Sequence, residues 1–131
     1  MTLSDLIPML ADEPALVSIL GRREGSIVIP EPARAIAIAS LADRAGRHPL
    51  IVAVPTTAEA ERLTRDLEAF LGVEEVEHFP AWETLPFERV SPAIDTMGRR
   101  SRVLWRLRQP ETAPAVIVAP VRALVQRLGP H

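Results

Sequence analysis

A strand followed directly by a helix is predicted by LIVAVPTTAEAERLTRDLEAFLG, residues 50–72. Residues 50–54 form a continuous apolar run between turn-forming residues, which is typical of a strand buried on both faces. Thr56 and Glu59 make a capping-box pattern at the start of the helix, and apolar residues then recur at spacings of three and four. Gly72 predicts the end of the helix, because glycine readily takes the left-handed conformation found there.

The same alternation continues on both sides of this stretch. Further strands are predicted at residues 26–29, 73–79 and 115–119, and further helices at residues 3–10, 14–20, 32–45, 92–108 and 121–128. Strands that alternate with amphipathic helices predict a parallel sheet with right-handed crossovers. We therefore expect an α/β fold with a parallel sheet flanked by helices. It would form a single domain over residues 1–131, with N-terminal helices in residues 1–24 and the α/β core in residues 25–130.

Composition excludes several kinds of site. The chain has 131 residues, 47% hydrophobic and 24% charged, and no cysteine, so it has no disulfide or thiolate metal site. Three scattered histidines (His48, His78 and His131) show no ligand spacing, and we expect no metal. No signal peptide or membrane-spanning run is visible, so we expect a cytoplasmic protein with no membrane partner. All 15 basic residues are arginine and 13 residues are proline, which indicates a GC-rich bacterial genome.

The most unusual segment follows residue 79. Pro80, Pro86 and Pro92 prevent any regular element from crossing it, yet Phe79 and Trp82 make it too apolar for a loose linker. We expect an ordered loop in which the Trp82 N–H bonds to a nearby carbonyl, although this ring could also stack on a base or anchor a partner.

Residues 79–100 and 116–124 resemble the N-terminal module of bacterial transcription-repair coupling factor. The likeness extends over roughly residues 15–130. It is strongest in a Trp-Glu-Thr-Leu-Pro element and in the Ser-Pro, Ile-Asp and arginine positions that follow. These residues are Trp82, Glu83, Thr84, Leu85, Pro86, Phe87, Glu88, Ser91, Pro92, Ile94, Asp95, Arg99, Arg100 and Arg102.

The resemblance implies a RecA-like, P-loop-type subdomain similar to the first nucleotide-binding half of UvrB. This chain would then be a non-catalytic scaffold packed against neighbouring subdomains of a larger protein. The parent protein would be an ATP-driven DNA translocase and hydrolase whose ATP and Mg²⁺ belong to other domains. It would act on stalled RNA polymerase and recruit nucleotide excision repair through UvrA, with DNA contact by this chain possible.

A P-loop would have to lie between residues 26–29 and the next helix. That position reads Pro30, Glu31, Pro32, Ala33, Arg34 and Ala35, in place of the usual glycines, lysine and hydroxyl residue. The prolines remove N–H donors, and Glu31 adds negative charge where phosphates would lie. One interpretation is a disguised nucleotide site that uses Arg34. The other, which the sequence favours, is a degenerate Walker A position in a chain that is not an enzyme and binds no cofactor.

Five arginines crowd the helix predicted at residues 92–108: Arg99, Arg100, Arg102, Arg106 and Arg108. They could contact DNA phosphates or an acidic partner, which gives the alternative function of a DNA-binding module. The interpretation that the sequence favours is a solvated helix face, with the last arginines favoured by the helix dipole. The net charge of −2 weighs against DNA binding.

The rest of that helix carries three further expectations. Asp95 should pair with Arg99 one turn later. An apolar stripe is predicted along it, made of Ile94, Met97, Val103 or Leu104, and Leu107. Trp105 should pack on the sheet beneath the arginine stems.

Overall fold

A three-stranded parallel sheet forms the centre of the protein in the computed structural model, which describes residues 1–84, 89 and 93–127. Its strands are β1 (Leu50–Val54), β2 (Val76–His78) and β3 (Val116–Pro120), in the spatial order β1–β3–β2. Val116 of β3 lies opposite Leu50 on one side and Val76 on the other. The predicted α/β class and parallel sheet are confirmed.

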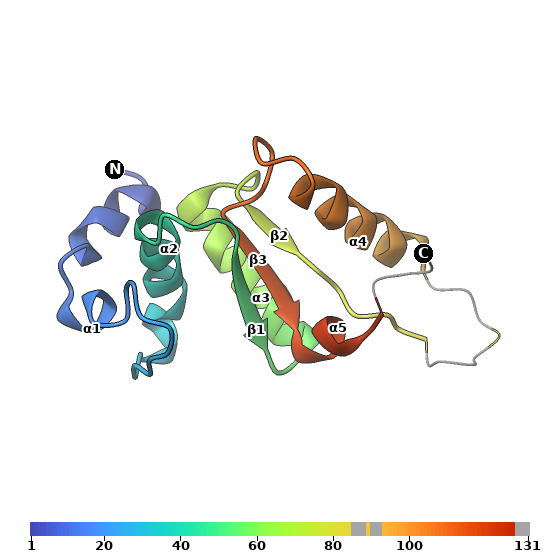
Figure 1. The fold of residues 1–131 in the computed structure, drawn as a ribbon, viewed down its shortest axis with the longest axis horizontal. Coiled ribbons are helices and arrows are strands. Elements are labelled where there is room, and N and C mark those ends of the chain that lie inside the picture. The colour runs from blue at the N-terminus through green and yellow to red at the C-terminus, as the bar shows by residue number, and fades with distance from the viewer. Residues whose placement is uncertain (85–88, 90–92, 128–131) are drawn as a thin grey trace.

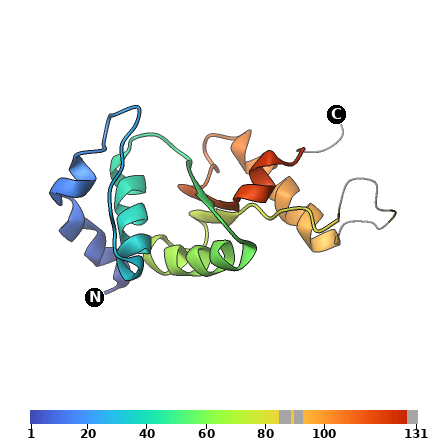
Figure 2. The same cartoon turned by 90° about the horizontal axis from the view of Figure 1, so that it is seen from below.

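The two long helices lie on opposite faces of this sheet (Figures 1 and 2). Helix α3 (Thr57–Leu71) connects β1 to β2, and α4 (Ile94–Leu107) returns from β2 to β3 in the middle. Right-handed crossovers that run in opposite directions place their helices on opposite faces. The short helix α5 (Val121–Val125) follows β3 and lies on the same face as α4.

Helix α3 begins and ends where its sequence predicts. The Thr56 hydroxyl accepts a 3.2 Å hydrogen bond from the Glu59 backbone N–H, which satisfies one of the free donors of the first turn. At the other end Gly72 has a φ of 94°, a conformation that a side chain would strain.

The first hydrophobic core lies between α3, the sheet and a layer of N-terminal helices. This layer comprises η1 (Leu3–Leu10), α1 (Pro14–Val17), η2 (Glu31–Ala33) and α2 (Arg34–Arg44). Helix α2 contributes Ala35, Ala39 and Ala42 to the core, and such small side chains let two helices approach closely. Ile7 of η1 joins the same cluster, so the N-terminal helices pack directly on the α/β core.

A second core lies on the other face of the sheet. Ile117 and Ala119 of β3 meet Val103 of α4, Ala123 of α5 and Phe79, which follows β2. Since α4 and α5 bury residues of β3 and the segment after β2, they leave the same face of β1 uncovered.

Two strand predictions are therefore wrong. Residues 26–29 form no strand, and Val28 is 96% exposed, because an apolar run becomes a strand only where a neighbour pairs with its backbone. Strand β1 is buried on one face only. Ile51 is 58% exposed, because β1 lies at the edge of the sheet beyond the reach of α4.

Candidate functional site

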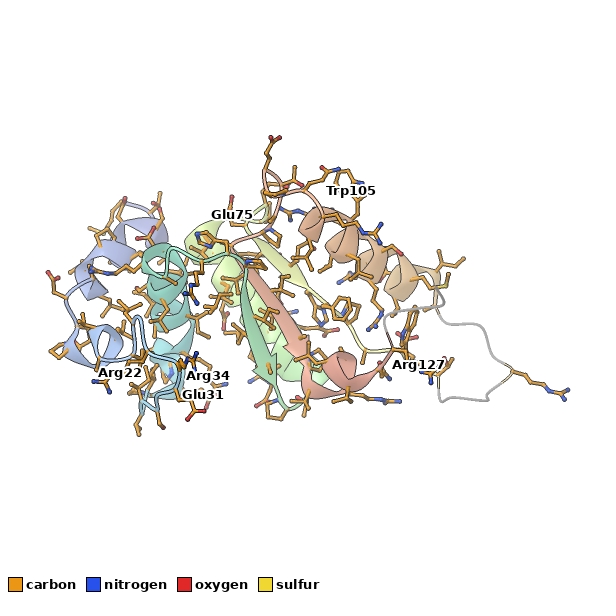
Figure 3. The ribbon with its side chains drawn as sticks, in the orientation of Figure 1. Arg22, Glu31, Arg34, Glu75, Trp105 and Arg127 are labelled. Atoms are coloured by element: carbon orange, nitrogen blue, oxygen red, sulfur yellow. The ribbon has the colours of Figure 1, made fainter. Side chains whose placement is uncertain are left out.

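The position predicted for a degenerate Walker A motif lies at the start of α2 and follows no strand. Pro30 and Pro32 carry no N–H, and the Ala33 N–H is bonded to the Pro30 carbonyl at 2.9 Å. Glu31 and Arg34 lie together there (Figure 3). The adjoining cleft of about 230 Å³ is also lined by the side chains of Glu59, Arg62 and Asp66. Few free N–H donors and several carboxylates make this segment a poor fit for a nucleotide's phosphates.

The arginine-rich helix instead turns one guanidinium into the protein. Arg100 is 1% exposed and lies between two aromatic rings, 4.2 Å from the centroid of Phe79 and 4.5 Å from that of Trp82. Its two terminal nitrogens donate to the Pro80 carbonyl at 2.7 Å and to the Arg127 carbonyl at 3.2 Å. Burial lowers the pKa of Arg100 from its usual value. We call Arg100, Phe79, Pro80, Trp82 and Arg127 the Arg100 cluster.

Trp82 connects the family-like loop to the far end of the chain. Its indole N–H donates to the Arg127 carbonyl at 3.2 Å, which confirms the predicted bond to a carbonyl. Its backbone N–H donates to the Gln126 side chain at 2.7 Å, and the Gln126 amide returns a 3.3 Å bond to the Trp82 carbonyl. The loop and the segment after α5 are thereby held together, although they are 44 residues apart in sequence.

The other motif residues are placed less completely. The Glu83 carboxylate accepts a 3.2 Å hydrogen bond from the Thr96 hydroxyl, which ties the loop to the start of α4. Leu85, Pro86, Ser91 and Pro92 lie outside the described residues.

The buried face of α4 matches the predicted apolar stripe only in part, at Val103 and at the partly buried Leu104. Ile94 is 86% exposed and Met97 is 44% exposed, whereas the residues that face inward are Thr96, Arg100, Val103 and Arg106. Hydropathy misplaces this face because a guanidinium can be buried where backbone carbonyls and aromatic rings replace its water.

Arg106 is the second buried cation. It donates to the Thr112 carbonyl at 2.7 Å, to the Glu77 carboxylate at 2.7 Å and to the Glu74 carbonyl at 2.6 Å. Arg102 donates to the same Glu77 oxygen at 2.8 Å. These contacts fasten the end of α4 to β2, to the turn before β2 and to the turn that follows α4.

Two of the five arginines, Arg100 and Arg106, are thus buried in internal contacts. Arg99 pairs with Asp95 at 3.1 Å, as predicted, and both side chains remain largely exposed. Arg108 is exposed just beyond the end of α4. Arg99, Arg102 and Arg108 are therefore the members of this group with a guanidinium that solvent reaches.

Trp105 does not pack on the sheet, and that prediction is wrong. It is 57% exposed and lies on the outer side of α4 (Figure 3). It follows Leu104 and precedes Arg106, both of which are more buried, so the helical period turns it outward.

His78 ends β2 beside a small cleft of about 180 Å³ at the carboxyl end of the sheet. The side chain is 7% exposed, and its Nε2 has no hydrogen-bond partner among the described residues. Burial lowers the pKa of His78 below its usual 6.5. The Glu61 carboxylate raises it in part, and Arg99 lowers it further.

We expect the free energy of unfolding to decrease as the pH is lowered from 7.5 to 5.5, a range that spans the usual histidine pKa of about 6.5. The unfolded chain binds a proton at His78 more readily than the folded chain, so the stability conferred by neutral His78 is lost as the pH drops below 6.5. Urea titrations at several pH values measure this slope. His78→Gln should flatten it, and the matched change of exposed His48→Gln should not; equal slopes in both variants would contradict the prediction.

Sequence reasoning missed Gln126 and Arg127 as partners of the loop, and His78 as a buried side chain beside the cleft that the loop lines. None of them belongs to a local pattern, and their roles come from backbone segments that meet only in the fold. Within residues 1–84, 89 and 93–127, no His, Asp and Glu side chains are grouped to hold a metal ion. No helix in this part of the chain is long and apolar enough to span a bilayer.

Comparison with known proteins places the chain in a family. No family model matches it. It is 34% identical over 139 residues to the transcription-repair-coupling factor of Mycobacterium tuberculosis, a match that covers 98% of this chain and 11% of that protein. The Escherichia coli protein of the same name is 33% identical over 93 residues, covering 70% of this chain and 8% of its own length. The Haemophilus influenzae protein is 33% identical over 98 residues, covering 75% and 8%. A chain this similar over nearly its whole length belongs to the transcription-repair-coupling factor family.

Proposed function

We propose that this chain is a non-catalytic scaffold subdomain of a transcription-repair coupling factor. The chain spans about 11% of the length of the mycobacterial relatives that it matches, which supports a role as one part of a larger protein. We further propose that its sheet belongs to a RecA-like subdomain of the UvrB type whose Walker A position has degenerated.

The observation that carries this proposal is the uncovered face of β1. Ile51 is 58% exposed and Ala53 is exposed beside it, while Ile117 on the neighbouring strand is buried beneath α4. Strands of parallel sheets are normally covered on both faces. A neighbouring subdomain that covers β1 would complete this layer.

The Arg100 cluster supports the same role. Trp82 in the loop after β2 binds the Gln126 side chain and the Arg127 carbonyl, and Arg100 in the middle of α4 binds the same carbonyl. A backbone held in this way would fix the orientation of a neighbouring part of the parent protein relative to this chain. The motif residues Trp82 and Glu83 would then have a structural role and not a catalytic one.

The activity and partners of the whole protein are part of this proposal. ATP hydrolysis and DNA translocation would belong to other domains, together with their ATP and Mg²⁺. Contact with RNA polymerase and UvrA would likewise be made by the parent protein. Residues 30–35 support this division, because their prolines and the carboxylates that line the adjoining cleft do not suit a phosphate chain. A DNA-binding module would have to rely on Arg99, Arg102 and Arg108. The exposed patch is therefore smaller than the group of five arginines suggested by the sequence.

Ile51→Asp tests the scaffold role in the full-length protein. We expect it to loosen the packing of this subdomain, because a carboxylate cannot be buried against an apolar neighbour without a partner. Limited proteolysis should then cut the protein near residues 125–131 several-fold faster, and recruitment of UvrA should weaken. In the isolated chain the same change should alter the free energy of unfolding by no more than about 0.5 kcal/mol, because Ile51 is largely exposed there.

Ala69→Asp is the matched control. It places the same charge on the exposed side of α3, on the opposite face of the sheet. Equal proteolysis of the two full-length variants would overturn the proposal that β1 is covered by a neighbour.

A further inference from the structure

A cleft lies at the end of α4, away from the Arg100 cluster and from the bare face of β1. Its volume is about 570 Å³, and Trp105 forms one wall. The indole is 57% exposed, an unusual position for the side chain that contributes most often to binding energy at interfaces. Figure 3 shows Trp105 on the outer side of α4 and Glu75 in the turn that leads into β2.

One buried side chain holds the walls of this cleft in place. Arg106 lies beneath it and bonds to Thr112 in the turn after α4, to Glu74 in the turn before β2, and to Glu77 of β2 itself. Three chain segments are thereby fixed relative to Trp105. A cleft that is formed before a guest arrives loses little conformational entropy on binding.

The charge of the cleft selects the guest. Glu74, Glu75 and Glu111 line it, and all three are exposed. The two cations on its wall, Arg102 and Arg106, share the Glu77 carboxylate at 2.8 and 2.7 Å. A cleft lined by an indole and three carboxylates suits a guanidinium or ammonium group, which the ring attracts through its quadrupole and the carboxylates through their charge.

We propose that Trp105, Glu74, Glu75 and Glu111 form a docking notch for an arginine- or lysine-bearing segment of the same polypeptide outside residues 1–131. The guest is a cationic side chain that stacks on Trp105 and reaches the carboxylates. This inference rests on the proposed function, since it requires that the chain be part of a longer protein.

The size of the notch favours a guest on the same polypeptide. One indole and a few carboxylates are far less than the roughly 1,000 Å² that a specific interface between separate proteins normally buries. A contact worth about 1 to 2 kcal/mol is enough when a linker holds the guest at an effective concentration in the millimolar range.

Hydroxyl-radical footprinting of Trp105 tests this assignment. Trp105 should be modified several-fold more slowly in the full-length protein than in the isolated 131-residue chain. Met9, which is 76% exposed on the N-terminal helices, serves as the internal reference. Raising the salt from about 0.1 M to about 1 M shortens the Debye length from roughly 10 Å to roughly 3 Å, and it should restore much of the reactivity of Trp105.

Charge reversal separates a cationic guest from a generic apolar cover. The double change Glu75→Arg and Glu111→Arg should expose Trp105 in the full-length protein. Asp12→Arg with Glu24→Arg, on the exposed N-terminal segment, should leave it protected. Three results would each overturn the notch: equal reactivity in both proteins, protection that survives charge reversal, and protection that appears only after a second protein is added. The Ile51→Asp experiment probes a different surface, the bare face of β1, so the scaffold proposal can fail while the notch stands, and the reverse.

Discussion

Arg100→Ala should lower the free energy of unfolding of this chain by about 3 to 5 kcal/mol. The change removes two charge-assisted hydrogen bonds and leaves the Pro80 and Arg127 carbonyls without that donor. It also removes the group that lies between the rings of Phe79 and Trp82 and so opens a cavity beside the middle of α4. Urea unfolding followed by far-ultraviolet circular dichroism measures the loss.

The neighbouring arginine provides the control for this change. Arg99 lies one residue earlier on α4, but its side chain is 55% exposed, and among the described residues it forms an ion pair with Asp95 alone. Exposed pairs of this kind contribute about 0.3 to 0.5 kcal/mol, so Arg99→Ala should be nearly neutral. Arg100→Met should fall between the two, because it keeps the apolar stem and loses the hydrogen bonds. Equal stabilities of the Arg99→Ala and Arg100→Ala variants would show that the Arg100 cluster does not hold the fold together.

Leu67→Ala is the second change with a large expected effect, also about 3 to 5 kcal/mol. Leu67 is completely buried on α3, in the core shared by the sheet and the N-terminal helices. Removing three carbon atoms there loses the free energy gained by burying them. It also leaves a cavity between the sheet and α2 that these elements cannot fill. Thermal unfolding monitored by calorimetry should show a lower midpoint with the transition still cooperative.

Leu124→Ala makes the matched comparison. Leu124 carries the same side chain but is 44% exposed on α5, so its truncation in the isolated chain should change stability by less than about 1 kcal/mol. A loss as large as that of Leu67→Ala would mean that α5 belongs to the core of the chain.

Local sequence was sufficient for the parts of the fold whose physics is local. Helix α3 begins at the Thr56 cap and ends at Gly72, because capping hydrogen bonds and the left-handed glycine involve only neighbouring residues. The alternation of apolar runs and amphipathic helices was likewise sufficient for the parallel α/β class, since crossover connections permit few other arrangements. The ion pair of Asp95 and Arg99 followed from helical spacing alone.

Hydropathy failed where the partner lies far away in sequence. It predicted a strand at residues 26–29, but strand formation depends on a neighbour that the described sheet does not supply. It placed Ile94 and Met97 inward and the arginines outward, whereas Arg100 and Arg106 are buried because carbonyls from distant segments receive their protons. It predicted that Trp105 is buried, whereas the packing of the neighbouring residues on α4 turns this side chain toward solvent.

A feature of this protein could be predicted from the sequence when the residues that interact are close together in the chain. The amino-acid order alone determines the capped helix, the strand-helix alternation and the absence of disulfides, since each depends on composition or on residues a few positions apart. Only the tertiary structure decides that β1 is an edge strand, that Arg100 joins the loop after β2 to the chain after α5, and that Trp105 stands beside three carboxylates. These features arise from contacts between segments distant in sequence, and no local pattern records which backbone carbonyl or carboxylate will be nearby.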